Sequence, residues 1–370
     1  MAFILISHAA VVFDAFVLID LSVSLLRYLV FFFVAFLYLQ KSVSRFEILW
    51  AVFFVYLLLA TFIGHGKVAM VIGPSIDIMI LLMMFHVYKK NIQTVLKATT
   101  AVLSFYVYLN MLLLILFPDG LWTDPISGNG YYLLGGNYNG IGARVVCALT
   151  TNMLICKDNR RAKVNIICLL AASLFSVLFV RSMTSTVSII MLVLLWLLAG
   201  IKKHRVLVIA FVIFYVVVQL FVVFLLSDIS NLTAIVDFME NVLHKDTTFT
   251  RRSLLWENSA DLIAKSPWIG YGYQDKVWNE QMLDGPGAHN FVYTVLLYGG
   301  YPLLLMFVGL VVLAVKRCAS QFNEWTLSRL LLGVCVFFFM MIFEYYSFFL
   351  IAYLLILTYY YPALCPKVKE

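Results

Sequence analysis

Long apolar runs, one after another along almost the whole chain, constrain the fold more than any other feature of this sequence. Each run approaches the roughly 20 residues that a helix needs to cross a hydrocarbon layer of about 30 Å. Of the 370 residues, 64% are hydrophobic and only 12% are charged, whereas a soluble domain is about half apolar and about a quarter charged. Lipid cannot satisfy backbone polar groups, so continuous runs of this kind predict membrane-spanning helices.

We expect an all-α, polytopic integral membrane protein with about 12 transmembrane helices. The first predicted span is the weakest because Asp14 interrupts it, and the last two are also compatible with a single kinked unit. No small-residue cleavage site follows the first span, so we do not interpret it as a removed signal peptide. The predicted spans are residues 2–19, 21–40, 48–64, 68–88, 98–117, 140–156, 164–181, 186–200, 206–226, 289–315, 325–344 and 349–363.

Lys and Arg gather in the loops on one side of these predicted spans. This positive-inside pattern places both termini in the cytoplasm. It accounts for most of the basic residues, so the net charge of +7 does not indicate a nucleic-acid partner. The basic segments are residues 41–47, 89–97, 157–163, 201–205, 316–317 and the tail 367–369.

The whole chain, 1–370, is expected to form one membrane domain with two external segments. Segment 118–139 is rich in Gly, Pro, Asn and Asp, which indicates a structured turn or a re-entrant loop. Segment 228–288 is a dense polar interval in an apolar chain, so we expect the chemistry there, on short helices. All six cysteines fall in spans, on the cytoplasmic side or in the tail, so a disulfide framework and a Cys-based metal site are both unexpected.

Residues 251–264 have the apolar spacing of an amphipathic helix, with Trp256 at the edge of the apolar face. Arg252 lies near the N-terminus of this helix, where free N–H groups and the helix dipole favour a phosphate. The alternative is that Arg251 and Arg252 are solvated or contact lipid headgroups.

Pro267 ends this helix, and Gly270 and Gly272 give the following turn the backbone freedom that a ligand-lining loop needs. His289 then opens the next span at its wet outer end, where an imidazole can exchange protons near neutral pH. Asn290 beside it can orient a hydroxyl or a carbonyl. A histidine at the end of a span is more often structural, but His289 has no His or Cys partner at metal-ligand spacing.

Several further ionisable residues lie at the outer side of the predicted membrane domain. Arg144 lies about one turn into its span, Arg181 ends another span, and Glu344 lies at an outer end. With Arg251 and Arg252, the arginines form an external set of cations that topology does not explain, and an anionic ligand such as a lipid-linked pyrophosphate does. The alternative is a set of internal ion pairs with the acidic residues of the long loop, Asp228, Asp237 and Glu240.

Four elements, in order, give the chain a resemblance to the O-antigen ligase and Wzy polysaccharide polymerase superfamily of bacterial membrane glycosyltransferases. The first two are Gly136-Asn137-Tyr138-Asn139, which opens a mid-chain span, and Arg181-Ser182, in which Val180 replaces the usual Ser. The others are Arg252-x-x-x-Trp256 with Pro267-x-x-Gly270-x-Gly272, and His289-Asn290 with its apolar continuation to Gly299-Gly300. The resemblance covers about residues 130–305.

This resemblance implies glycosyl transfer at the outer face of a bacterial cytoplasmic membrane, with an undecaprenyl-pyrophosphate-linked oligosaccharide as donor. His289 would be the general base on the acceptor hydroxyl in an inverting displacement, and Arg181 and Arg252 would hold the pyrophosphate, with Arg144 a weaker candidate. Trp256 would stack on a sugar ring and Asn290 would position it. The remaining candidate substrate-binding residues are Asn137, Asn139, Arg251, Gly270 and Gly272.

The resemblance also implies a metal-independent reaction without a cofactor, and the chain contains no Asp-x-Asp pair. We expect a polymerase that joins lipid-linked repeat units into capsular, exo- or O-antigen polysaccharide; the acceptor would then be a second lipid-linked unit. Flippase and chain-length regulator proteins are the implied protein partners. The compact chain weakly favours a polymerase over the alternative, an O-antigen-type ligase that transfers polysaccharide to another acceptor.

A second alternative, from a different class, is a flippase or another transporter of lipid-linked oligosaccharides, and a third is a membrane protein whose long loop binds a partner. A transporter should line a path between the two leaflets with its cations, whereas the cations here are expected at the outer face. The geometry of Arg181, Arg252 and His289 separates these classes. Clustering in one outward-facing cavity favours transfer, and separation onto different faces excludes it.

Overall fold

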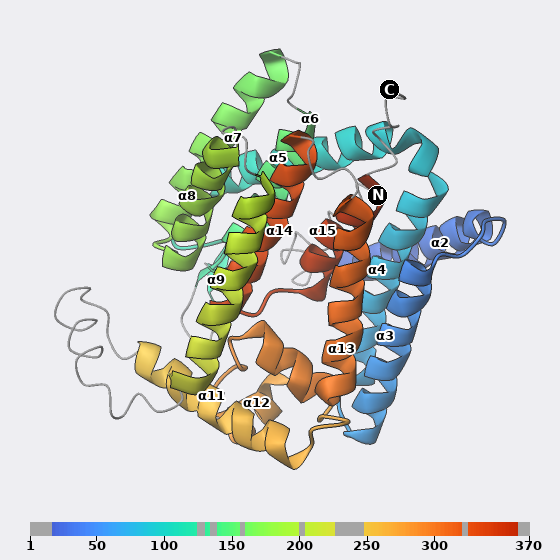
Figure 1. Cartoon of the computed structure of the whole chain (residues 1–370), viewed down its shortest axis with the longest axis vertical. Helices are drawn as coiled ribbons and strands as arrows, with labels where there is room; N and C mark the ends of the chain where they lie inside the picture. Colours follow the sequence, from blue (N-terminus) through green and yellow to red (C-terminus); the bar gives the residue numbers. More distant parts are fainter. Residues whose placement is uncertain are drawn as a thin grey trace.

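The structure is a computed structural model that describes residues 17–123, 130–133, 139–155, 160–199, 204–225, 248–319 and 325–361. The described part is almost entirely helical (Figure 1). Its α-helices are α2 (Val17–Tyr38), α3 (Arg45–Ile63), α4 (Val68–Val87), α5 (Ile92–Leu116), α6 (Gly140–Ile155), α7 (Arg160–Phe179), α8 (Met183–Leu198), α9 (His204–Leu225), α11 (Thr248–Lys265), α12 (Lys276–Leu283), α13 (Phe291–Ala319), α14 (Trp325–Phe343) and α15 (Phe348–Tyr360).

A helix occupies each predicted span from 21–40 onward, whereas most of the predicted span 2–19 lies outside the described residues. Within the described part, 5 helices are long and apolar enough to cross a membrane, namely α3, α4, α5, α7 and α13. In the other apolar helices the apolar stretch found among the described residues is shorter, as in Leu25–Tyr38 of α2 and Val206–Leu220 of α9. The chain is therefore an all-helical membrane protein, while the count of 12 crossings and the side on which each loop lies remain predictions.

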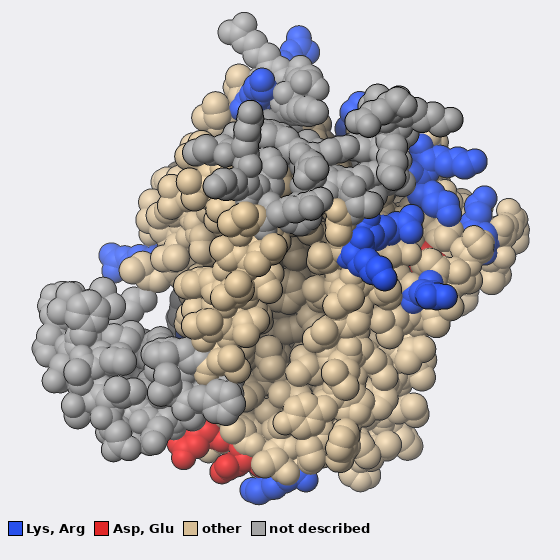
Figure 2. Space-filling model, viewed as in Figure 1, with Lys and Arg blue, Asp and Glu red and all other residues tan. Residues whose placement is uncertain are grey.

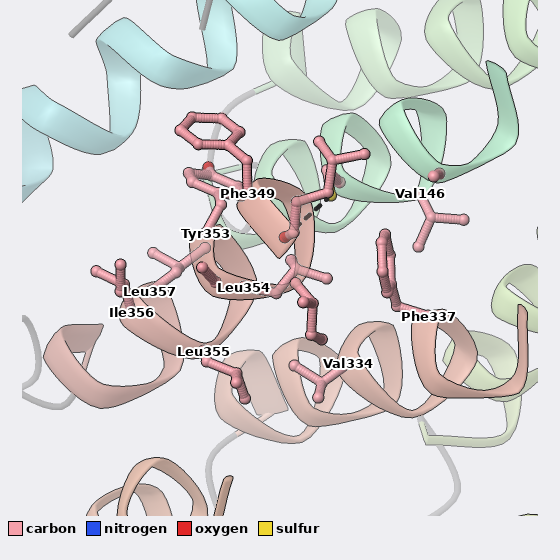
Figure 3. Packing of buried hydrophobic residues seen from close by; sticks show 14 of the residues in the cluster. Val146, Val334, Phe337, Phe349, Tyr353, Leu354, Leu355, Ile356 and Leu357 are labelled. Atoms are coloured by element: carbon pink, nitrogen blue, oxygen red, sulfur yellow. Dashed lines mark hydrogen bonds between the residues drawn. The ribbon is translucent and has the colours of Figure 1, made fainter. Parts of the chain in front are cut away.

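Helix α15 lies in the core of the bundle. All of its residues from Phe348 to Tyr360 are buried, and it packs against α4, α6, α13 and α14. Figure 3 shows side chains of α15, including Tyr353 and Leu354, packed against Phe337 of α14 and Val146 of α6. Burial on every side explains why the sequence of this helix is apolar all round rather than amphipathic.

Helices α11 and α12 form a separate layer at one end of the bundle, at the bottom of Figure 1. The predicted amphipathic helix is thus confirmed as α11, whose residues Leu255, Leu262 and Ile263 are buried in a second core against α13. On the face shown in Figure 2, Lys and Arg gather mostly in the upper half of the view, away from this layer. This distribution agrees with the expected cytoplasmic position of the basic loops.

Helix α13 is broken at Gly299 and Gly300, where the backbone leaves helical geometry. The turn between α11 and α12 fills this break: Tyr271 N donates to Leu297 O at 2.6 Å, and Gly272 N donates to Tyr298 O at 3.1 Å. These donors satisfy carbonyls that the break leaves without helical partners. The predicted external segment 118–139 contains a short antiparallel pair, β1 (Trp122–Thr123) with β2 (Gly130–Tyr131).

Candidate functional site

The carboxylate of Glu344 is the centre of the candidate site. Its Oε1 accepts hydrogen bonds from Arg252 Nη2 at 2.5 Å and Asn139 Nδ2 at 2.8 Å, and its Oε2 lies 2.8 Å from His289 Nδ1. The Glu344 side chain is only 5% exposed. A buried carboxylate is stable only when charges and donors compensate it, and here a guanidinium, an amide and an imidazole do so.

These side chains come from segments far apart in the sequence. Arg252 lies in the first turns of α11, and Glu344 follows the last residue of α14. Asn139 immediately precedes α6 and accepts a hydrogen bond from Ser182 Oγ at 3.2 Å, and Ser182 lies 2.8 Å from Ser185 Oγ. The network therefore connects α6, α8, α11 and the start of α13 to the end of α14.

His289 is held in a left-handed backbone conformation, with φ of 46°. This conformation is unfavourable for residues with a side chain, by about 1–3 kcal/mol, and persists only where the surroundings enforce it. Both chain neighbours of His289 are anchored: Ala288 O accepts from Trp256 Nε1 at 2.9 Å, and Asn290 Nδ2 donates to Ile342 O at 3.0 Å. These anchors fix the imidazole beside Glu344.

The roles expected for Trp256 and Asn290 must be revised. Both side chains are fully buried: Trp256 packs in the core beneath α11, and Asn290 also bonds to the amide of Gln219 at 3.3 Å. A buried indole has no face open to a sugar, and Asn290 is likewise closed to a ligand. The sequence correctly placed both residues beside the site, but their geometry makes them positioning residues for His289.

Arg181 lies in the connection between α7 and α8 and also has a left-handed backbone, with φ of 55°. Its side chain is exposed, and it is directly followed by Ser182, which belongs to the Glu344 network through Asn139. The structure thus brings Arg252 and His289 onto one carboxylate and places the backbone of Arg181 one residue from the same network. Separation onto different faces would exclude transfer, and Arg252 and His289 are not separated in this way. Of the three residues, however, only His289 lines the cavity described below.

The remaining candidate residues differ in how far they approach the network. Arg144 is half-buried in α6, the helix that Asn139 precedes. Arg251 belongs to α11, but its side chain lies outside the described part, and so does Asn137. The loop acids considered as ion-pair partners, Asp228, Asp237 and Glu240, also lie outside the described residues.

Gly270 and Gly272 serve the packing of the turn that fills the α13 break. Both have left-handed backbones, with φ of 68° and 72°, and a Cβ on Gly272 would lie 2.2 Å from Thr61 Cα. Residues with side chains cannot enter this contact without moving the backbone. The freedom predicted for the turn is therefore used for close approach to α3 and α13, while Gly272 also lines a cavity.

This cavity, with a volume of about 760 Å³, opens beside His289 and Glu344. Its walls come mainly from the segment between Tyr271 and His289, the first turns of α13, and Tyr131 of β2. Burial raises the pKa of the phenols of Tyr271 and Tyr273 above the ordinary value, so both remain neutral near pH 7. The pKa of Asp275 is lowered, first by the hydrogen bond from Trp278 N and then by Lys67.

No group of three or more His, Cys, Asp and Glu side chains within the described ranges has the arrangement of metal ligands. The two Glu344 oxygens already accept hydrogen bonds from protein donors. The acid–base and cationic groups at or near the described site are His289, Glu344, Arg252 and Arg181.

Glu344 was expected at an outer end of a span, but no role in the site was predicted for it. Its signal was present, because an acidic residue between two apolar helices is costly in a membrane and indicates a functional position. Its partners lie 55, 92 and 205 residues away in the chain, so no local motif joins it to them. Only the tertiary fold shows that it connects the Arg252, His289 and Asn139 elements.

Residues 167–308 match the family described as O-antigen ligase. The matched region begins within α7 and ends within α13, so it includes Arg181, Arg252 and His289 and leaves out Asn139 and Glu344. No curated protein and no solved structure shows a significant match to the chain.

Proposed function

The match over residues 167–308 confirms the resemblance to the O-antigen ligase and Wzy superfamily, and on this premise we propose a specific reaction. The coarse function is of the polysaccharide ligase or polymerase type, in a membrane. Our proposal is a polymerase that joins undecaprenyl-pyrophosphate-linked oligosaccharide repeat units at the outer face of a bacterial cytoplasmic membrane. The observation that carries it is the convergence of Arg252 and His289 on Glu344 at the edge of a large cavity.

His289 has the geometry of a general base. With Nδ1–H donated to Glu344 Oε2, the imidazole keeps Nε2 free to accept a proton. In the proposed step an acceptor hydroxyl oxygen attacks the anomeric carbon of the donor and gives its proton to His289 Nε2. The bond from the anomeric carbon to the pyrophosphate oxygen breaks, the electron pair leaves with undecaprenyl pyrophosphate, and the configuration inverts.

The arginines are suited to the leaving group. Arg252 uses one Nη2 hydrogen bond on Glu344 and has further N–H donors, and its side chain is 22% exposed. It also lies in the first turns of α11, where free backbone N–H groups favour an anion. Arg252 and Arg181 would stabilise the charge that develops on the departing pyrophosphate, which is a large contribution to catalysis in a site prepared for it.

Glu344 acts as a positioning residue in this scheme. It orients the imidazole of His289, and its charge stabilises the imidazolium that forms as the acceptor proton is taken. It also fixes Arg252 on the opposite oxygen. In this scheme one carboxylate sets the distance between two groups. His289 faces the attacking hydroxyl, and Arg252 faces the leaving pyrophosphate.

A ligase is the second candidate, and the family match itself favours it, because the matched family is described as O-antigen ligase. The chemistry at the anomeric carbon is the same in both cases. The two functions differ in the acceptor, which is a second lipid-linked repeat unit for a polymerase and a different glycolipid or a protein for a ligase.

The test uses purified protein and the lipid-linked oligosaccharide extracted from source cells whose own copy carries His289→Ala. The reaction is run with EDTA, and the products are separated by length. We expect longer lipid-linked chains from the native protein and none from His289→Ala. Equal products from both would remove His289 as the base. Product formed only after a different glycolipid or a protein acceptor is added would establish the ligase instead.

A further inference from the structure

We propose that the cavity beside His289 is a binding subsite for an uncharged acceptor saccharide, recognised mainly by Trp278, Tyr271 and Asn279. The inference rests on the proposed glycosyl transfer and adds which side of His289 each substrate occupies. It also names residues that no family motif identifies.

The position of His289 separates two environments. His289 and Glu344 line the cavity, whereas Arg252, Arg181 and Asn139 are not among its described lining residues. The cavity therefore meets the Glu344 network at His289 and Glu344, and the arginines do not form its described walls. If the pyrophosphate of the donor binds the arginines, the cavity remains available to the acceptor, which is the molecule that provides the attacking hydroxyl.

The cavity wall has the chemistry of a sugar site. The rings of Tyr271 and Trp278 lie side by side, with centroids 5.4 Å apart, and both residues are half-buried. Aromatic rings of this kind present apolar faces to the C–H faces of a pyranose and polar edges to its hydroxyls. Asn279, one residue further along α12, adds an amide that can both donate to and accept from hydroxyls.

The charges in the wall disfavour a strongly anionic ligand. Its described lining has three acids, Asp275, Glu280 and Glu344, but only one lysine, Lys276, which lies 3.8 Å from Glu280. Apart from His289, the described wall therefore offers little positive charge to a phosphate or a carboxylate. A neutral saccharide is not repelled by the acids. It also leaves no cation in the wall without a counter-charge.

The volume of the cavity and the segments that form its walls indicate a site with room for more than one sugar ring. A volume of about 760 Å³ lies in the upper part of the range of about 300–1,000 Å³ that small-molecule sites occupy. Tyr131 of β2 lines the cavity together with α12, so this strand forms part of the same wall. We assign Tyr131 to the acceptor side of the site.

A binding experiment tests the subsite without turnover. The probe is the free oligosaccharide released by mild acid from the lipid-linked oligosaccharide described above, and its binding to His289→Ala protein is followed by saturation-transfer NMR. Trp278→Ala added to this background should raise Kd about tenfold, whereas Trp278→Phe should retain most of the binding. Asn279→Ala is a second variant that removes the amide and leaves the aromatic pair in place.

Trp268→Ala is the matched control, since Trp268 lies in the neighbouring turn, is 67% exposed and does not line the cavity. It should leave Kd unchanged within about twofold. Unchanged Kd in both Trp278→Ala and Asn279→Ala, with the variants folded, would overturn the subsite. Loss of binding in Trp268→Ala alone would overturn it as well.

A kinetic experiment separates this inference from the proposed function. With the free oligosaccharide as acceptor, Trp278→Ala should raise the acceptor KM about tenfold and leave the donor KM unchanged. If the native protein transfers sugar but Trp278→Ala changes the donor KM instead, the subsite assignment is wrong and the proposed function stands. If the native protein transfers nothing while the Trp278-dependent binding persists, the proposed transfer is wrong and the saccharide site stands.

Discussion

Within the described part of the chain, a buried glutamate meets a histidine at two places, one near each end of α15. Near the start of α15, Glu344 contacts His289; near its end, Glu47 of α3 contacts His86 of α4. Helix α15 has 13 residues and is therefore about 20 Å long, so the two clusters lie near its opposite ends. The same pair of side chains therefore occurs in two settings, and the differences between the settings indicate which pair can react.

The Glu47 cluster is closed. Glu47 also accepts hydrogen bonds from Tyr360 and from Tyr38 at 2.9 Å, and from Ser44 N at 2.5 Å. The side chains of Glu47 and His86 are only 2% and 3% exposed. These contacts fasten the ends of α2, α4 and α15 to the start of α3, so we interpret the cluster as a structural connection at the basic end of the bundle.

The Glu344 cluster is open. The His289 side chain is 28% exposed, has a strained backbone, and borders a cavity, and a guanidinium shares its carboxylate. Burial and hydrogen bonding of the carboxylate are alike in both clusters. A cation is present at both clusters but binds at different places: Arg252 contacts the carboxylate of Glu344, whereas Lys89 Nζ lies 3.2 Å from His86 Nε2, the nitrogen that a base would need. Access to a ligand and this position of the cation distinguish the proposed reactive site from the structural one.

Replacement of the two histidines gives the largest expected contrast. His289→Ala should lower the transfer rate by about 10²–10⁴-fold, because it removes the proposed base. His86→Ala should leave the rate per folded molecule nearly unchanged and lower the free energy of unfolding by about 1–3 kcal/mol, since its buried partners lose a hydrogen bond. Transfer assays and thermal unfolding of both variants measure the two effects, and equal activity losses would remove the distinction between the clusters.

Replacement of the two glutamates sharpens the comparison. Glu344→Gln keeps the volume but removes the charge that orients His289 and Arg252, so the transfer rate should fall about 10- to 100-fold. Glu47→Gln should mainly lower stability, by about 1–3 kcal/mol. A Glu344→Gln enzyme as active as the native one would show that the carboxylate only packs the helices.

The guanidinium on the carboxylate is a feature of the Glu344 cluster that the Glu47 cluster does not share, and replacement of Arg252 tests it. Arg252→Lys keeps the charge but loses the planar fork, so the KM for the lipid-linked donor should rise about tenfold. Arg251→Lys is the control, because Arg251 does not have the family spacing to Trp256. A larger rise in the donor KM for Arg251→Lys than for Arg252→Lys would indicate that Arg251 binds the pyrophosphate. That result would contradict the role proposed for Arg252.

The smallest expected effect concerns acid stability at the cavity wall. The pKa of Asp275 is lowered from 3.8 by its hydrogen bond from Trp278 N and by Lys67, so its ionised form stabilises the fold. This contribution is complete above the unfolded pKa and is lost as the pH falls through the lower folded pKa. Asp275→Asn should have a slightly lower Tm than the native protein near pH 7, and the difference should shrink near pH 3. A difference that grows on acidification would contradict the sign of this linkage.

Much of the fold was accessible from the sequence because its signals are local. Apolar runs located the apolar helices, and amphipathic spacing located α11. Arg252 was predicted from its place near a helix start, His289 from its place at a span end, and both from the family resemblance; the structure brings them together on Glu344. These features depend on short stretches of chain, so one sequence is enough to find them.

The rest depended on tertiary packing. Trp256 and Asn290 were correctly associated with the site, but their full burial follows from α11 and α14 packing around the start of α13. Glu344 was noticed only as an acid at an outer end, since its three donors come from distant segments. The cavity wall at Trp278 had no sequence signal, because it forms when α12 folds back against the start of α13.

The most direct test of the account is a double-mutant cycle on transfer rates with His289→Ala and Glu344→Gln. If Glu344 acts mainly by orienting His289, Glu344→Gln should cost about 10- to 100-fold in the native background. In the His289→Ala background it should cost less than about threefold, because residues that act as a unit are strongly non-additive. The same fold-loss in both backgrounds would show that the two residues act independently, and would contradict the proposed Glu344–His289 unit.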